Sequence, residues 1–316
     1  MQHVTLSAPA KINLFLNVGL TRPDGFHEIL SLIQAVSLCD ILTVARSSVD
    51  DTLALSGPFT SGLSVTENLV LQAVHELRKV VPTLPPVSIK LEKNIPHGSG
   101  LGGGSSDIAT TLKAANILFS LELDSTALAG IASKISSDAP FFFSTGSALV
   151  SGRGEIIHPL SIPLDYWLAI VMPGATMSTR EAYVALDSAG IPSLTLPKPA
   201  PIIATYSSLR LAVQLVGELR SCGNDFEGVF CRDSNIESGD TVKRAGVAGH
   251  LIGDTGRGDD IAAIRACLLE AGAKIVRLTG SGSAVYGIFT EPLTPATTAK
   301  LRRDGWQVFV TRPLRL

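Results

Sequence analysis

The segment Ile95–Phe119, which reads IPHGSGLGGGSSDIATTLKAANILF, combines many glycines with an amphipathic pattern that follows at once. Glycines allow φ > 0 and close backbone approach, and the first turn of a helix offers unpaired N–H groups with a partial positive charge. Together they can cradle an anion such as a phosphate group. The hydroxyls of Ser105 and Ser106 can add donors or reach a metal on the phosphates. The alternative is a glycine-rich turn in which Ser105 simply caps the helix.

The glycine spacing alone does not identify the ligand. Residues 98–103 match G-x-G-x-x-G, but the dinucleotide-binding interpretation needs an acidic residue about 20 positions later. Position 123 is Leu, and Asp124 has the position of a helix cap. A dinucleotide-dependent oxidoreductase is therefore disfavoured. The Walker-type loop fails as well, because no Lys-Ser/Thr pair follows the glycines.

Lys11, His27 and Asp138 are further residues whose types could serve catalysis or binding. Each also has an ordinary structural explanation, as a solvated strand lysine, a turn or core histidine, and a helix-end carboxylate. Lys11 and Asn13 occupy odd positions of an alternating segment, and we expect them to project together, away from the core side.

The elements that must position these groups follow from the hydrophobic pattern. Every even position from Val4 to Leu20 is apolar, which predicts one long strand, and TRPDGFHE (21–28) predicts a turn. We expect strands around 29–37, 41–46 and 85–96, a Thr-capped helix at 66–80, a helix opening near Ser105, and a helix capped by Asp124. Pro140 should end that last helix, and FFFSTGSALVSGRGE should return to strand.

The second half begins after a proline-rich interruption at residues 158–166, where WLAIVMPG predicts a new strand. AKIVRLTGSGSAVYGIF predicts a strand, a loop and a strand, followed by a short helix and the strand WQVFVT. Strict βα alternation is absent. The expected fold is therefore α+β, with two domains at residues 1–162 and 163–316.

The composition excludes several classes of protein. Of the 316 residues 45% are apolar, and the formal net charge of −2 gives no electrostatic basis for binding nucleic acid or an anionic membrane. No segment predicts a membrane span or a signal peptide, so a cytoplasmic location is expected. The four cysteines form no C-x-x-C pair and are expected to be free thiols: Cys39, Cys222, Cys231 and Cys267.

Three separated stretches resemble the three motifs of the GHMP kinases, small-molecule kinases that use ATP. They are APAKINLFL with RPDGFHE, then IPHGSGLGGGSSD, then LTGSGSAVYGIF, and the resemblance spans most of residues 4–290. It implies a two-domain α+β fold with the active site in the interdomain cleft. The first pair is similar to members whose substrate bears cytidine diphosphate. The implied reaction is ATP-dependent phosphorylation of the 2-hydroxyl of a cytidyl-diphospho-methylerythritol, in the non-mevalonate isoprenoid pathway.

The resemblance also implies roles for single residues. Asp138 would be the catalytic aspartate and Lys11 its partner. The implied ATP-binding residues are Asn68, Leu69, Lys93, Pro96, Gly98, Gly100, Leu101, Gly102, Gly103, Gly104, Ser105 and Ser106. The implied substrate-binding residues are Asn13, Phe26, His27, Thr179 and Tyr183. His27 would bind cytosine, and the rings of Phe26 and Tyr183 would sandwich it. ATP and Mg²⁺ are the implied cofactors, without assigned metal ligands, and a monomer or weak homodimer is expected.

Two other functions remain open. A different GHMP kinase, of the homoserine or mevalonate type, would need neither the Phe26/Tyr183 pair nor the D-G-[YF]-H turn. A non-catalytic nucleotide-binding regulator on the same scaffold would not need Lys11 and Asp138. The chain also departs from the family pattern, with Phe26 where tyrosine is usual and with a longer, more polar segment at residues 232–260.

Overall fold

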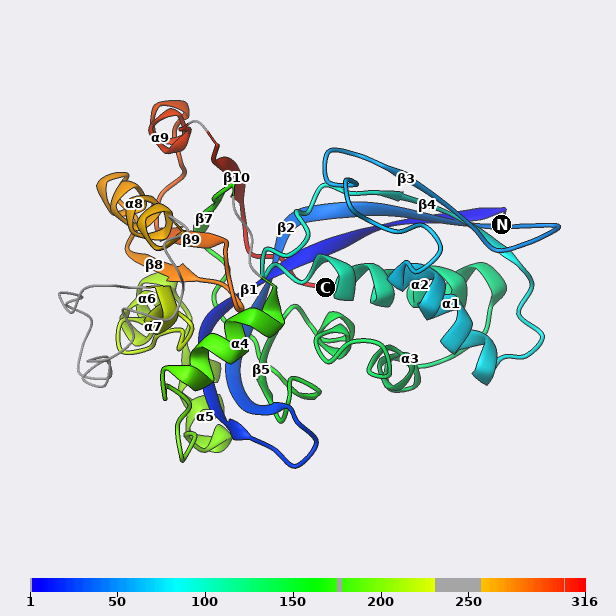
Figure 1. Cartoon of the computed structure of the whole chain (residues 1–316), viewed down its shortest axis with the longest axis horizontal. Helices are drawn as coiled ribbons and strands as arrows, with labels where there is room; N and C mark the ends of the chain where they lie inside the picture. Colours follow the sequence, from blue (N-terminus) through cyan, green and yellow to red (C-terminus); the bar gives the residue numbers. More distant parts are fainter. Residues whose placement is uncertain (1, 175–177, 231–256, 304) are drawn as a thin grey trace.

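The computed structural model describes residues 2–174, 178–230, 257–303 and 305–316 (Figure 1). One sheet contains β1 (His3–Thr21), β2 (His27–Arg46), β3 (Thr52–Ser56), β4 (Val87–Glu92), β5 (Ser147–Ser151) and β6 (Ile156–Pro159). The other contains β7 (Trp167–Met172), β8 (Ile275–Leu278), β9 (Val285–Phe289) and β10 (Gln307–Thr311), in the order β10-β7-β9-β8. All strand pairs are antiparallel except β3 with β4, and the α+β prediction is confirmed.

Helices pack on both sheets. In the first half they are α1 (Leu69–Val80), α2 (Gly103–Phe119), α3 (Ser125–Ala132) and the 3₁₀ helix η1 (Ala139–Phe143). In the second half they are α4 (Thr179–Ser188), α5 (Pro199–Ser208), α6 (Ala212–Leu219), α7 (Glu227–Phe230), α8 (Arg257–Glu270) and α9 (Pro295–Leu301). No helix in these described ranges is long and apolar enough to cross a membrane.

The long hairpin of β1 and β2 is the framework of the first sheet. It pairs from His3 with Ala45 to Thr21 with His27. The expected separate strands at 29–37 and 41–46 are therefore wrong, because continuous pairing with β1 keeps all of β2 extended. On its other edge, residues 31–34 of β2 pair with β5 and residues 41–46 pair with β4, so the single strand β2 connects the two parts of the sheet.

Lys11 and Asn13 project together as expected, on the face opposite Ala10, Ile12 and Leu14 of the hydrophobic core, but their own face is not open to solvent. The two residues are only 4% and 3% exposed. The loop before α2 and the loop between β8 and β9 cover this face of β1, since Lys11 N–H donates to Leu101 O at 2.9 Å and Asn13 N–H donates to Thr279 Oγ1 at 3.1 Å. Alternation places these side chains on one face but does not show what covers that face.

Several helix boundaries differ from the sequence prediction. Asn68, and not Thr66, caps α1, because its side chain accepts from Val70 N–H. The helix after the glycines begins at Gly103 with Gly102 as N-cap, so Ser105 is not its cap. Asp124 caps α3 as predicted, by accepting from Ala127 N–H.

The FFF segment was expected to be strand but lies in η1. Pro140 stands in its first turn, a position where a missing N–H is not needed. Phe141 and Phe142 are buried, and the strand begins only at Ser147.

The two sheets share their hydrophobic cores. One cluster joins Ile12 and Leu149 of the first sheet to Leu168 and Tyr286 of the second. Successive residues of β7 alternate between this cluster, which α5 and α6 complete, and a second cluster that contains residues of α8 and α9. The domain division at residues 162 and 163 stays a prediction.

The cysteines Cys39, Cys222 and Cys267 are unpaired. Cys231 and nearly all of the polar segment 232–260 lie outside the described residues.

Candidate active site

A pocket of about 920 Å³ lies where residues of both halves meet. Eighteen of the nineteen residues singled out from the sequence line it, and Ser106 does not. Ser106 is fully buried on α2 and its hydroxyl has no partner among the described residues. The pocket therefore collects side chains that are up to 270 positions apart in the chain, from Lys11 to Ser281 (281 − 11 = 270).

Residues 98–104, called the glycine loop from here on, form one wall of the pocket. Gly98, Gly100 and Gly102 have φ of 64°, 78° and 70°, in the left-handed region that favours glycine. Gly102 caps α2 without any side-chain hydrogen bond, and no acidic residue stands in the first turn. The first N–H groups of α2 are thus available to an anion, which is what a phosphate cradle requires.

The loop between β8 and β9 packs directly on the glycine loop. A Cβ added to Gly100 would lie 2.2 Å from Thr279 O, and Ala284 N–H donates to Ser99 O at 3.2 Å. The two loops therefore support each other at van der Waals distance.

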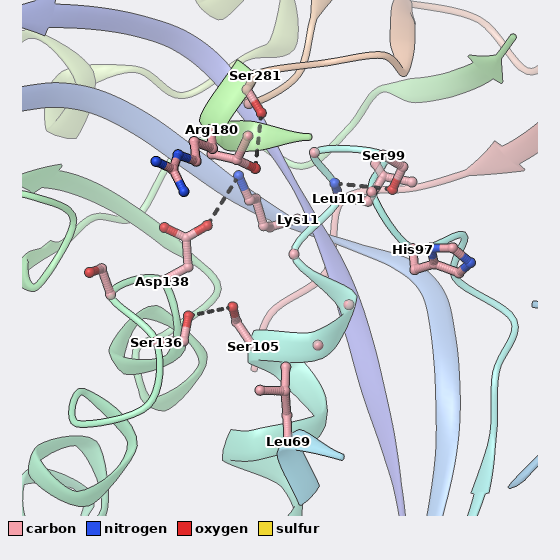
Figure 2. A pocket seen from close by; sticks show the side chains of 18 of the residues that line it. Lys11, Leu69, His97, Ser99, Leu101, Ser105, Ser136, Asp138, Arg180 and Ser281 are labelled. Atoms are coloured by element: carbon pink, nitrogen blue, oxygen red, sulfur yellow. Dashed lines mark hydrogen bonds and ion pairs between the residues drawn. The ribbon is translucent and has the colours of Figure 1, made fainter. Parts of the chain in front are cut away.

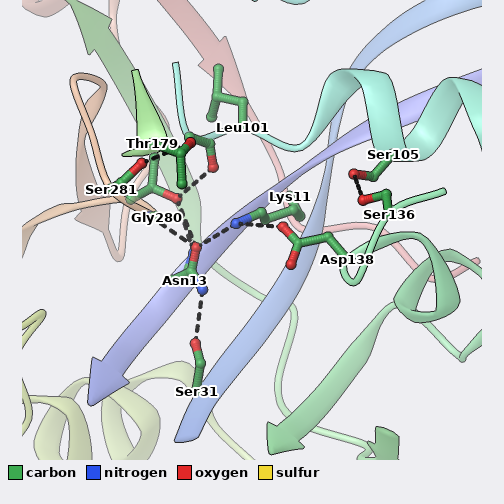
Figure 3. A network of polar contacts seen from close by, with 12 residues as sticks. Lys11, Asn13, Ser31, Leu101, Ser105, Ser136, Asp138, Thr179, Gly280 and Ser281 are labelled. Carbon is green, nitrogen blue, oxygen red and sulfur yellow. Dashed lines mark hydrogen bonds and ion pairs between the residues drawn. The ribbon is translucent and has the colours of Figure 1, made fainter. Parts of the chain in front are cut away.

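Asn13 joins these loops to β1 (Figure 3). Its amide oxygen accepts from Lys11 Nζ at 2.7 Å and from Gly280 N–H at 2.9 Å, while its amide nitrogen donates to Ser31 Oγ at 2.8 Å. The family resemblance implied that Asn13 binds substrate, whereas these contacts connect β1 to β2 and to the loop between β8 and β9. Its contact with substrate stays a prediction.

Lys11 and Asp138 meet at the centre of the pocket (Figure 2). Their Nζ and Oδ2 atoms are 3.5 Å apart, and the side chains are 5% and 37% exposed. Asp138 is thus open to a reactant, while Lys11 is held from behind by Asn13. Beside them Ser105 and Ser136 exchange a hydrogen bond of 2.8 Å. The pair places a cation beside an accessible carboxylate oxygen, the arrangement that a general base and a stabiliser of negative charge require.

His27 and Tyr183 lie at one end of the pocket. Their rings stack with centroids 4.8 Å apart and an interplanar angle of 27°. Burial, reinforced by the charge of Asp138, raises the pKa of Tyr183, so its hydroxyl stays protonated. Phe26 is 49% exposed, and the Arg153 guanidinium lies 4.8 Å from its ring centre. Tyr183 therefore stacks on His27 in this structure, and its predicted pairing with Phe26 around a base is not tested.

Leu69 offers an apolar surface to the pocket. It is 38% exposed and approaches the glycine loop so closely that a Cβ on Gly104 would lie 2.9 Å from its Cδ1. Asn68 uses its side chain to cap α1 and to donate to Ser64 O at 3.1 Å. Both positions suit the side of a purine pocket, which stays a prediction.

Lys93 is held in a buried triad with Asp40 and Asp107. Its ammonium donates to both carboxylates, at 2.7 Å to Asp107. Asp40 also accepts from the N–H groups of Asn94 and Ile95, whereas Asp107 Oδ1 has no partner among the described residues. Burial and the charge of Asp40 raise the pKa of Asp107 to about 7, although Lys93 opposes the shift. Lys93 therefore reaches the pocket wall with its charge already paired.

Comparisons with known proteins agree with this geometry. Residues 68–146 match the model of the GHMP kinases N terminal domain. A 4-diphosphocytidyl-2-C-methyl-D-erythritol kinase of Thermodesulfovibrio yellowstonii is 33% identical over 96% of this chain and 95% of its own length. A protein of the same name from Citrifermentans bemidjiense is 34% identical over 99% of this chain and 100% of its own.

The chain belongs to the GHMP kinase family. A crystal structure of a 4-(cytidine 5′-diphospho)-2C-methyl-D-erythritol kinase also superimposes on this kinase with a TM-score of 0.68 and 27% identity, covering 98% of this chain and 99% of the other. The predicted family, fold and enzyme class are confirmed, and the protein is a small-molecule kinase.

Sequence reasoning missed several residues that line the pocket of this kinase, notably Arg153, Arg180 and Asp187. Figure 2 shows Arg180 on the Asp138 side of Lys11. Arg180 and Asp187 lie on α4, which also carries Tyr183, at spacings of three and four residues that share a helix face. This periodicity was a usable signal. Arg153 follows a strand as a single cation, and no pattern distinguished it.

Proposed function

We propose that this kinase transfers the γ-phosphoryl group of ATP to the 2-hydroxyl of 4-diphosphocytidyl-2-C-methyl-D-erythritol, a step of non-mevalonate isoprenoid synthesis. The observation that carries the proposal is one pocket that brings together the Lys11–Asp138 pair, a glycine cradle and the aromatic group of Phe26, His27 and Tyr183. The near-full-length similarity to kinases named for that substrate supports it.

The proposed reaction divides the work among these residues. The glycine loop and the N-terminus of α2 hold the phosphates of ATP through backbone N–H groups. The oxygen of the substrate hydroxyl forms a bond to the γ-phosphorus, and Asp138 accepts the proton of that hydroxyl. The bond between the γ-phosphorus and the oxygen that bridges it to the β-phosphate breaks, which releases ADP. Lys11 stabilises the negative charge on the transferred group.

Magnesium is the metal that we propose for this site. The described residues contain no group of three His, Cys, Asp or Glu side chains that could hold a metal without help. Hard oxygen atoms are nevertheless present at the reacting end, in Ser105 and Asp138, and Mg²⁺ in kinases is bound by one or two such groups together with the phosphates. The ion would neutralise charge on the phosphate oxygens during transfer.

A kinase assay with the purified protein tests the proposal. The acceptor panel is the cytidylyl substrate, homoserine, mevalonate and methylerythritol phosphate without cytidine, each with ATP and Mg²⁺. We expect kcat/KM to be highest for the cytidylyl substrate by at least about 100-fold, since the pocket aligns that acceptor and leaves buried polar groups unpaired with the others. Preference for homoserine or mevalonate would replace the proposal with another GHMP kinase activity, and no turnover of any acceptor would favour a regulator. Cytoplasmic location and a monomeric or weakly dimeric state remain predictions.

A further inference from the structure

His27 has a fixed orientation in the pocket. It is the first residue of β2 and is 8% exposed. Its Nε2 lies 2.8 Å from Asp187 Oδ1 and 3.2 Å from Thr21 Oγ1. Tyr183 covers one face of the ring, and Tyr183 in turn meets Phe226 edge-on at 4.9 Å. The imidazole is thus held on one edge and one face.

Asp187 decides which ring nitrogen of His27 carries the hydrogen. An ionised carboxylate can only accept, so the short contact requires Nε2 to be the N–H donor. In a neutral imidazole the other nitrogen, Nδ1, is then an acceptor. Nδ1 has no hydrogen-bond partner among the described residues, and His27 lines the pocket. The acceptor is therefore available to a bound substrate.

Resting on the proposed function, we propose that Asp187 is a positioning residue that makes the pocket select cytosine over uracil. By holding the Nε2–H tautomer, it leaves Nδ1 to accept from the 4-amino group of cytosine. The uracil ring carries a carbonyl at that position, and two acceptors would then face each other. A site built to pair one donor discriminates strongly against an analogue that lacks it.

Helix α4 supplies both restraints on the His27 ring. Tyr183 and Asp187 are four residues apart and therefore lie one turn apart on the same face. His27 comes from the hairpin of the first sheet, so the orientation of its ring depends on α4 being docked against that hairpin. The loss of Asp187 removes the shorter edge contact, and with it the acceptor-only partner of Nε2, but leaves Thr21 Oγ1 and the stack with Tyr183.

The tautomer can be measured without any substrate. In the protein labelled with ¹⁵N-histidine, two-bond ¹H–¹⁵N correlation at pH 8 should show His27 with hydrogen on Nε2, and His27→Asn assigns the signal by removing it. In Asp187→Asn the introduced amide can offer either its oxygen or its NH₂ group, so we expect a mixed tautomer. Hydrogen on Nδ1 in the unchanged protein would overturn the proposal, whatever the enzyme phosphorylates.

Kinetics then test the consequence. For the unchanged enzyme we expect kcat/KM for the cytidylyl substrate to exceed that for its uridylyl analogue by about 100-fold or more. Asp187→Asn and Asp187→Ala should reduce this ratio to about 10-fold or less, with KM for ATP unchanged. Ser188→Ala is the matched control, because this neighbouring hydroxyl is exposed and, among the residues that the structure describes, bonds only to Val184 O.

The outcomes separate the two proposals. If the unchanged enzyme ignores the cytidylyl substrate, the proposed function fails and the cytosine selectivity fails with it, while the tautomer result still reports on the role of Asp187. If the enzyme uses the cytidylyl substrate but Asp187→Asn and Asp187→Ala keep the full ratio, Asp187 is only structural and the positioning role is refuted.

Discussion

Replacing Gly100 with alanine should damage ATP binding through backbone geometry alone. At φ of +78° a non-glycine residue costs about 1–2 kcal/mol. The new Cβ would also lie 2.2 Å from Thr279 O and 3.3 Å from Gly282 O. Both atoms are backbone, so the glycine loop and the β8–β9 loop must separate, at a typical overpacking penalty of about 1–3 kcal/mol. The sum is a destabilisation of about 2–5 kcal/mol.

Two measurements on purified Gly100→Ala follow the two effects. The melting temperature should fall, and KM for ATP should rise by at least about 10-fold, because the N–H groups of the cradle lose their alignment. Gly130→Ala is the matched control, since that glycine lies in α3 with nothing within 4 Å of the added Cβ. It should keep KM and gain up to about 1 kcal/mol of helix stability. An unchanged KM for ATP in Gly100→Ala would refute the link between loop packing and nucleotide binding.

Three further predictions concern single residues. Asp138→Asn should lower kcat by about 10²–10⁴-fold while ATP still binds, and an unchanged rate would refute its role as the base. Phe26→Ala should raise KM for the cytidylyl substrate about 10-fold with little effect on ATP, because one stacked ring is worth about 1–3 kcal/mol. A shift in the ATP constant instead would contradict the pocket assignment. The free energy of unfolding of Asp107→Asn minus that of the wild type should be about 1 kcal/mol higher at pH 8 than at pH 6, as measured by unfolding both proteins at both pH values.

The sign of the last effect follows from the raised pKa. The carboxyl of Asp107 has a folded-state pKa of about 7, above that of an unfolded aspartate, so the folded protein holds the extra proton in mild acid. That contribution to stability is fully present at low pH and is lost as the pH rises through 7. An asparagine cannot ionise, so the difference between the two proteins should grow with pH. A difference that stays constant would show that Asp107 is ionised throughout.

The sequence was sufficient for the parts of the molecule that rest on local physics. Alternation from Val4 to Leu20 predicted β1, and the carboxylate of Asp124 predicted the start of α3. The glycines predicted a loop with left-handed backbone before a helix, which Gly98, Gly100 and Gly102 confirm. The three motif stretches were sufficient to identify the family, because each keeps its residue types in order.

Only the tertiary structure could show what covers each face and which charges meet. Lys11 and Asn13 are buried because loops from distant parts of the chain close over β1. Strand β2 is continuous because it pairs along its length with the continuous strand β1. The resemblance implied only an ATP-binding role for Lys93, and the structure pairs it with Asp40 and Asp107, 53 positions before it and 14 after it. The spacing of Asp187 from Tyr183 indicated a shared helix face, but the role proposed for Asp187 depends on a 2.8 Å contact with His27 across 160 positions. Such contacts depend on packing between elements, and residue spacing along one chain carries no record of it.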